Sequence, residues 1–156
     1  MYTKEKVLKY TEMKQEIFDS LGPREQGSIL GCAVEPYTTE RRGAILTDEP
    51  GSDMIENGKE IEIKSSWKFN KGNIRWGGMF SKYRKCDGFF LIDGVNNRVY
   101  QPDHDTVFNK CRLDNAGGKG ELRGTKANME ILLPFETFGH LEEDDFDWRK
   151  EKTFSG

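Results

Sequence analysis

The stretch GSDMIENGKEIEIKSSW, residues 51–67, carries the strongest fold signal in this chain of 156 residues. Asn57-Gly58 lies between two short segments in which apolar and polar residues alternate, a pattern typical of a β-hairpin with a two-residue turn. Counting outward from the turn pairs Asp53 with Glu62. Because directly opposed residues have Cβ atoms about 4.5–5.5 Å apart, the sequence predicts two carboxylates within bridging distance of each other.

Alternation along the second strand places Glu60, Glu62 and Lys64 on one face, and Ile61 and Ile63 on the other, where they join the core. Like charges that oppose each other destabilise a sheet and raise each other's pKa, unless a cation lies between them. Mg²⁺ suits such a pair, because it prefers oxygen ligands and accepts one or two carboxylates together with phosphate oxygens. A nearby lysine could orient water or stabilise developing charge. The alternative is the polar face of an ordinary sheet.

The composition is that of one domain over residues 1–156, with 35% hydrophobic and 33% charged residues and a net charge of −3. No apolar run approaches the ~18 residues of a membrane span, and the charged start predicts no signal peptide. The three cysteines, at unrelated spacings, fit neither a disulfide framework nor a zinc site. We therefore expect a cytoplasmic protein with no membrane partner.

Apolar spacing and turn residues predict helices over 4–20 and about 23–34, with Pro36 ending the second. Strands are expected around the Asn57-Gly58 turn and over 89–92, 98–101 and 129–133. Further helices are expected over 79–85, 105–113 and 135–141, and loops over 68–78 and 115–128. The expected fold is a mixed α/β (α+β) domain. It has N-terminal helices over 1–35, a catalytic core over 44–141 and an acidic tail over 142–156.

Basic and aromatic residues follow the hairpin: between residues 63 and 86 there are seven basic residues and no acidic one. Such a stripe can neutralise phosphates, and Arg and Asn can read base edges. A second Gly- and Lys-rich loop lies over 115–128. We place Arg75 and Trp76 at a loop tip, and Trp67 and Phe80 in the core. The candidate DNA contacts are Lys68, Lys71, Asn73, Arg75, Trp76, Lys82, Arg84, Lys119 and Arg123.

The spacing of Asp53, Glu62 and Lys64 resembles the motif of the PD-(D/E)XK nuclease superfamily. The stretch GSDMIENGKEIEIKSS is similar to the active-site hairpin of PvuII-like type II restriction endonucleases. The resemblance covers roughly residues 49–101, although Ser52 stands where that family has proline. It implies a mixed central sheet flanked by helices, as in restriction endonucleases.

By position, the resemblance makes Asp53, Glu62 and Lys64 the catalytic residues, with the carboxylates of Asp53 and Glu62 and the carbonyl of Ile63 as metal ligands. Glu49 and Glu25 both qualify as an additional upstream acid. The implied cofactor is Mg²⁺, with Mn²⁺ as a substitute. The implied partner is double-stranded DNA, cut by a homodimer.

The sequence therefore favours a Mg²⁺-dependent DNA endonuclease, most simply a type II restriction enzyme whose twofold symmetry matches a palindromic site. A Holliday-junction resolvase or a homing-type endonuclease could carry the same active site. The alternative from another class is a nucleic-acid-binding module whose acidic residues are structural.

Overall fold

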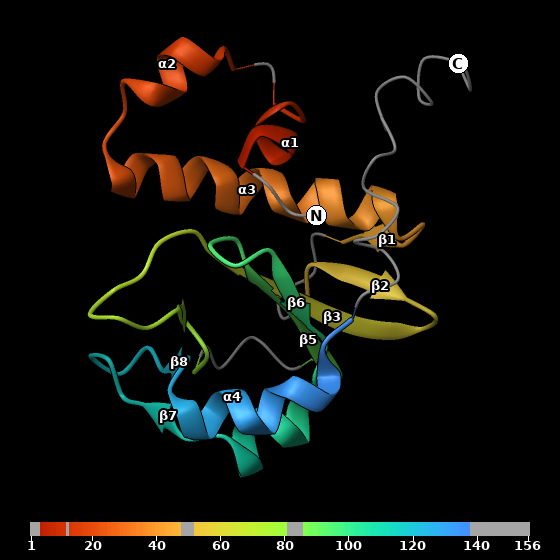
Figure 1. The fold of residues 1–156 in the computed structure, drawn as a ribbon. Coiled ribbons are helices and arrows are strands. Elements are labelled where there is room, and N and C mark those ends of the chain that lie inside the picture. Colours follow the sequence, from red (N-terminus) through yellow and green to blue (C-terminus); the bar gives the residue numbers. More distant parts are fainter. Residues whose placement is uncertain (1–3, 12, 48–51, 81–85, 138–156) are drawn as a thin grey trace.

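The computed structural model describes residues 4–11, 13–47, 52–80 and 86–137. At its centre is a five-stranded sheet in the order β1–β2–β3–β5–β6. The strands are β1 (Ile45–Leu46), β2 (Met54–Glu56), β3 (Lys59–Ser66), β5 (Gly88–Asp93) and β6 (Arg98–Tyr100). β3 and β5 are parallel and the other neighbours are antiparallel, so the sheet is mixed. Helices lie on both sides of it (Figure 1), which confirms the expected mixed α+β class.

The β2–β3 hairpin has the register that the sequence predicts as far as its ladder extends. The ladder pairs Glu56 with Lys59, Ile55 with Glu60 and Met54 with Ile61. The turn residues Asn57 and Gly58 both have positive φ, at 52° and 77°. A type I′ turn needs that conformation at both central positions, and Asn-Gly provides it at low cost. The local turn chemistry therefore fixes which side chains β3 presents to each face.

One face of the sheet is covered by α3 (Pro23–Arg41), which runs across it in Figure 1. Ile61 and Ile63 of β3 are 4% exposed and belong to the same buried cluster as Leu30 and Val34 of α3. The short helices α1 (Lys4–Leu8) and α2 (Gln15–Asp19) add Val7, Leu8 and Phe18 to this cluster. The isoleucines of β3 thus point into the core, as the alternation predicts.

The opposite face packs against a small second sheet and the C-terminal helices. This sheet has the order β4–β8–β7, with β4 (Arg75–Gly77), β7 (Leu113–Asp114) and β8 (Glu121–Arg123). Phe89 and Leu91 of β5 are buried in one cluster with Trp76, Leu122 and Leu132. The helical segments on this side are η1 (Thr106–Lys110), α4 (Lys126–Leu132) and η2 (Leu133–Phe135).

The N-terminal helices differ from their predicted limits. The region 4–20 holds α1 and α2 with a non-helical break between them, rather than one helix. α3 continues through Pro36 to Arg41, beyond the predicted end at residue 34. Proline removes one backbone donor from a helix. Here Tyr37, Thr38 and Thr39 are buried after it, and their burial offsets the lost hydrogen bond.

The second half of the chain shows a further error. Residues 129–133, predicted as a strand, belong mostly to α4, whose start is capped by the Thr125 hydroxyl accepting from the Asn128 N–H at 3.3 Å. A five-residue apolar run fits a helix or a strand equally well, and the cap decides for the helix. The predicted loops over 68–78 and 115–128 contain β4 and β8, which pair with each other.

Other predictions for this half have mixed outcomes. Helix is present over 104–110 of the predicted 105–113. Of the predicted helix over 79–85, residues 79–80 form a turn and 81–85 lie outside the described residues. Glu136 bridges to Tyr100 instead of starting a helix, and residues 138–141 and the tail over 142–156 also lie outside.

Candidate active site

Asp53 directly precedes β2, and its contacts reach the two residues that flank Glu62. Its backbone N–H donates to the Ile61 carbonyl at 2.9 Å. Its Oδ2 accepts the Ile63 N–H at 2.8 Å. The expected direct pair of Asp53 with Glu62 is therefore not a rung of the ladder, which ends at Met54. The side chain instead replaces a backbone acceptor and fixes the Asp53 carboxylate beside β3.

Glu62 and Lys64 lie on the face of β3 opposite to the isoleucines. The side chain of Glu62 is 3% exposed and that of Lys64 is 14% exposed, with Nζ of Lys64 3.8 Å from Oε1 of Glu62. Their partners on β5 are Phe89 and Leu91, which belong to the second core cluster. A carboxylate is rarely buried to this extent unless a positive group compensates it. Lys64 is one such group.

Gly78 directly follows β4 and lies against the end of Lys64. A Cβ added at Gly78 would be 3.1 Å from Lys64 Nζ, and the backbone there has a φ of +68°. Both observations favour glycine at this position, since a side chain would be strained and would crowd the amine. Gly78 therefore leaves the space that the Lys64 amine occupies.

Cys86 is a neighbour of Glu62 that the sequence analysis missed. Burial and, to a smaller degree, the Glu62 carboxylate together raise the pKa of the Cys86 thiol to about 12, against a backbone hydrogen bond with Glu62 that acts in the opposite direction. The residue lies just before β5, whose Gly88 pairs with Ile61. Only the parallel register of β3 and β5 could have revealed this neighbour, and the sequence does not specify that register.

The donor groups present fit a hard cation. Asp53 and Glu62 offer carboxylate oxygens, and the Ile63 carbonyl points to the same strand edge as its N–H, toward Asp53. Mg²⁺ needs only one or two carboxylates and keeps several waters. Among the described residues, no group of three His, Cys, Asp or Glu side chains is close enough together to hold a metal.

Of the two upstream acids, Glu25 lies among the described residues and adds no third carboxylate to this pair. Glu25 is exposed in the first turn of α3 and folds back against Gly22, so it does not join Asp53 and Glu62. Glu49 lies outside the described residues.

The predicted DNA contacts lie in several different environments. Lys68, Lys71 and Lys119 are exposed, and Asn73 forms a bridge with Asn70 at the base of the 71–72 turn. Arg75 and Arg123 are paired across β4 and β8, and both contact Glu121. The two basic segments that the sequence analysis treats as separate loops thus form one sheet. Lys82 and Arg84 lie outside the described residues.

Two aromatic residues have places opposite to those predicted. Trp76 was expected at a loop tip, but it is 1% exposed on β4 and its indole N–H donates to the Ile92 carbonyl at 3.0 Å. Phe80 was expected in the core and is 39% exposed. The prediction that Trp76 contacts DNA is therefore wrong for this conformation, because its side chain fills the second core cluster. Trp67, 7% exposed, is in the core as expected.

Comparisons with known proteins give little beyond this geometry. No model of a known protein family matches the chain, and no curated protein matches it. Among solved structures, the chain is similar to the bacterial homing endonuclease I-Ssp6803I at 15% identity and a TM-score of 0.49. That similarity covers 85% of this chain and 99% of the other chain. A similarity this weak assigns no function to the chain.

Within the part of the chain that the structure describes, no helix has both the length and the apolar character needed to cross a membrane.

Proposed function

We propose that the chain is a metal-dependent DNA endonuclease of PD-(D/E)XK type. The observation that supports this proposal best is the arrangement around Ile63. The N–H of Ile63 donates to the Asp53 carboxylate. Glu62 and Lys64, on either side of Ile63 in the sequence, share the face of β3 opposite to the Ile63 side chain. Two carboxylates and a lysine thus lie on one hairpin, and they are the set that the resemblance to PD-(D/E)XK nucleases predicts.

The roles follow from the chemistry of each group. Asp53, Glu62 and the Ile63 carbonyl would hold Mg²⁺ or Mn²⁺, which when bound supplies Lewis-acid polarisation of a phosphate oxygen. Lys64 would orient the attacking water or stabilise the charge that develops on the phosphate. The water oxygen bonds to phosphorus and the bond to the 3′ oxygen breaks, so the product carries a 5′-phosphate.

The finer assignment rests on the resemblance of the hairpin to type II restriction endonucleases. We propose cleavage of double-stranded DNA by a homodimer, because one such site cuts one strand and a twofold pair would cut both. Lys68, Lys71 and Lys119 are exposed and free to meet phosphates of the duplex. Arg75 and Arg123 would first have to exchange their contacts with Glu121 for DNA.

The test is incubation of the purified protein with plasmid DNA in Mg²⁺, in Mn²⁺ and in EDTA. Metal-dependent linearisation that is lost in Glu62→Gln supports the proposal. Discrete fragments indicate a sequence-specific restriction or homing-type enzyme, and selective cleavage of a four-way junction indicates a resolvase. DNA binding by wild type without cleavage in either metal would reject the nuclease and leave a binding module.

A further inference from the structure

A groove at the end of β3 lies beside the candidate active site but is built from other residues. It has a volume of about 390 Å³ and lies between the start of α3 and the ends of β3, β4 and β8. That volume falls in the usual range of sites for small ligands. Residues of the groove that the proposed chemistry does not use include Lys4, Arg24, Ser28, Ser65, Ser66 and Trp67.

The charge of the groove is opposite to that of the whole chain. Its lining includes the cations Lys4, Arg24, Lys68 and Arg75 and the single acid Glu121, whereas the chain carries a net charge of −3. Glu121 Oε1 is 3.1 Å from Arg75 Nη1. The charge of the other three cations remains uncompensated by any acid of the lining. A concentration of positive charge in a concave site attracts anions.

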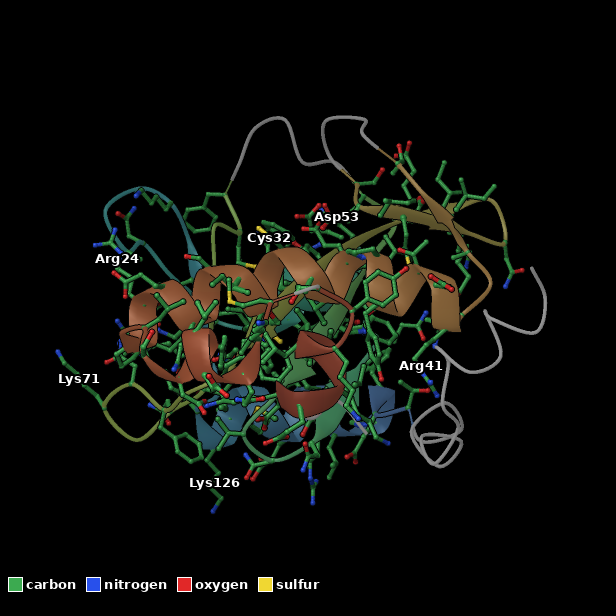
Figure 2. All side chains as sticks on the ribbon, turned by 90° about the horizontal axis from the view of Figure 1, so that it is seen from above. Arg24, Cys32, Arg41, Asp53, Lys71 and Lys126 are labelled. Atoms are coloured by element: carbon green, nitrogen blue, oxygen red, sulfur yellow. The ribbon has the colours of Figure 1, made fainter. Side chains whose placement is uncertain are left out.

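The start of α3 does not supply this positive charge by itself. Its N-cap, Gly22, offers no side chain to the first-turn amides, but the Glu25 carboxylate already lies against Gly22. The side-chain cations around the groove therefore determine its preference. Arg24 is exposed in the first turn of α3, at the end of the helix opposite to Arg41 (Figure 2).

The lining of the groove begins at Ser65, one residue after the proposed catalytic lysine, which is not itself part of the lining. Ser65, which follows Lys64, faces α3: a Cβ at Gly31 would lie 3.9 Å from its hydroxyl oxygen. Ser66 faces the other way, and its hydroxyl accepts the Arg75 N–H at 3.4 Å. The groove therefore wraps around the end of β3. From Lys64 to the end of β3 at Ser66 an extended chain covers roughly 7 Å, a length over which one nucleic acid strand carries about two phosphates.

Resting on the nuclease proposed above, we infer that this groove binds the sugar-phosphate backbone of one DNA strand next to the scissile phosphate. Lys4, Arg24 and Lys68 neutralise its phosphates, and Ser28 and Ser65 are hydroxyl donors that can reach phosphate oxygens. Glu121 opposes binding, because it is the only acid of the lining. A phosphodiester and free phosphate share this chemistry, and the experiment below distinguishes them.

The first measurement is the affinity of the full chain for a fluorescent DNA duplex, in Ca²⁺ to suppress cleavage, over a series of salt concentrations. Arg24→Ala should weaken binding and reduce the slope of log Kd against log salt by about one. Glu121→Gln should strengthen binding, a gain that misfolding cannot produce. Lys126→Ala is the matched control, since it removes the same single charge and Lys126 is exposed at the start of α4, outside the groove.

The second measurement locates the ligand. The Trp67 indole N–H donates to Ser65 Oγ at 2.9 Å inside the groove, whereas that of Trp76 is buried against Ile92. In ¹H–¹⁵N spectra, the duplex should shift the Trp67 indole signal and leave that of Trp76 in place. Inorganic phosphate at equal ionic strength should shift neither the Trp67 nor the Trp76 signal. If phosphate alone reproduces the shift and displaces the duplex, the groove is a small-anion site and the DNA-strand assignment is wrong.

The two proposals can fail separately. If wild type cuts plasmid but Arg24→Ala binds DNA as wild type does, or Lys126→Ala weakens binding as much as Arg24→Ala does, the groove assignment is rejected and the nuclease is retained. If wild type cuts nothing, yet Arg24→Ala loses affinity and the Trp67 signal responds to DNA, the groove is retained and the nuclease is rejected.

Discussion

Lys64 Nζ lies 3.8 Å from Glu62 Oε1 on a single strand, and both side chains are largely withdrawn from water. Each compensates the charge of the other in a place where neither would be stable alone. The pair also faces the space that Gly78 leaves beside the lysine amine. This geometry is therefore compatible with two roles for Lys64, as a catalytic residue or as a structural counter-ion of Glu62.

Lys64→Ala should reduce the single-turnover cleavage rate by orders of magnitude while the affinity for DNA in Ca²⁺ changes little. A lysine that only anchors phosphate would give the opposite result. Lys64→Arg should fail as well, because a guanidinium stays protonated and its bulk would crowd Gly78. Because removing the lysine charge can destabilise the fold around Glu62, thermal melts of each variant check that a lost rate is not lost folding. A near-wild-type single-turnover rate in Lys64→Ala would remove the lysine from the chemistry.

Asp53→Asn and Asp53→Ala should have different effects on stability and the same effect on activity. The asparagine carbonyl can still accept the Ile63 N–H, whereas alanine leaves that donor unpaired at a cost of about 1–3 kcal/mol. Both changes remove the carboxylate that would hold the metal, so neither variant should cut DNA. Urea unfolding and plasmid digestion measure the two effects. Full activity of Asp53→Asn would contradict the site assignment.

Glu62→Gln should retain the fold without metal, because glutamine keeps the shape of the side chain and its carbonyl oxygen can still accept a hydrogen bond from the Lys64 amine. Mg²⁺ should raise the Tm of wild type by more than that of the variant, since a ligand stabilises only the state that binds it. Differential scanning calorimetry in Mg²⁺ and in EDTA makes the comparison. Equal shifts in both proteins would mean that the carboxylate does not bind the ion.

The cysteines should react with a thiol reagent in a fixed order. Cys32 is exposed, whereas burial raises the pKa of Cys86 and of Cys111. With a pKa of about 12, only about one Cys86 thiol in ten thousand is ionised at pH 8, and the thiolate is the reactive form. In folded protein at pH 8, the reagent should therefore modify only Cys32 rapidly.

The Glu62→Gln variant tests how far the Glu62 carboxylate contributes to the slow modification of Cys86. Removing the carboxylate lowers the pKa of Cys86, so more thiolate forms and its modification rate should rise. In a Cys32→Ser background, mass spectrometry can follow Cys86 and Cys111 separately, with Cys111 as the internal control. An unchanged Cys86 rate would show that the thiol does not sense Glu62.

The sequence alone determined the hairpin and the residues that it presents. Asn57-Gly58 specifies its own turn, and alternation along β3 then assigns Ile61 and Ile63 to the core and Glu62 and Lys64 to the other face. These are interactions between residues close in the chain, so a short window of sequence contains them.

The tertiary structure decided what surrounds the hairpin. Trp76 is buried on β4, which pairs with β8 so that Trp76 lies opposite Leu122, 46 residues further along the chain. No local pattern in this Gly-rich segment predicts that pairing. Cys86 reaches Glu62 through the parallel register of β3 and β5, which depends on the whole crossover between them. Asp53 joins β3 through its side chain rather than through the ladder. The stability of contacts between distant segments depends on how those segments pack. Only the folded chain brings them together, so a short window of sequence does not contain this information.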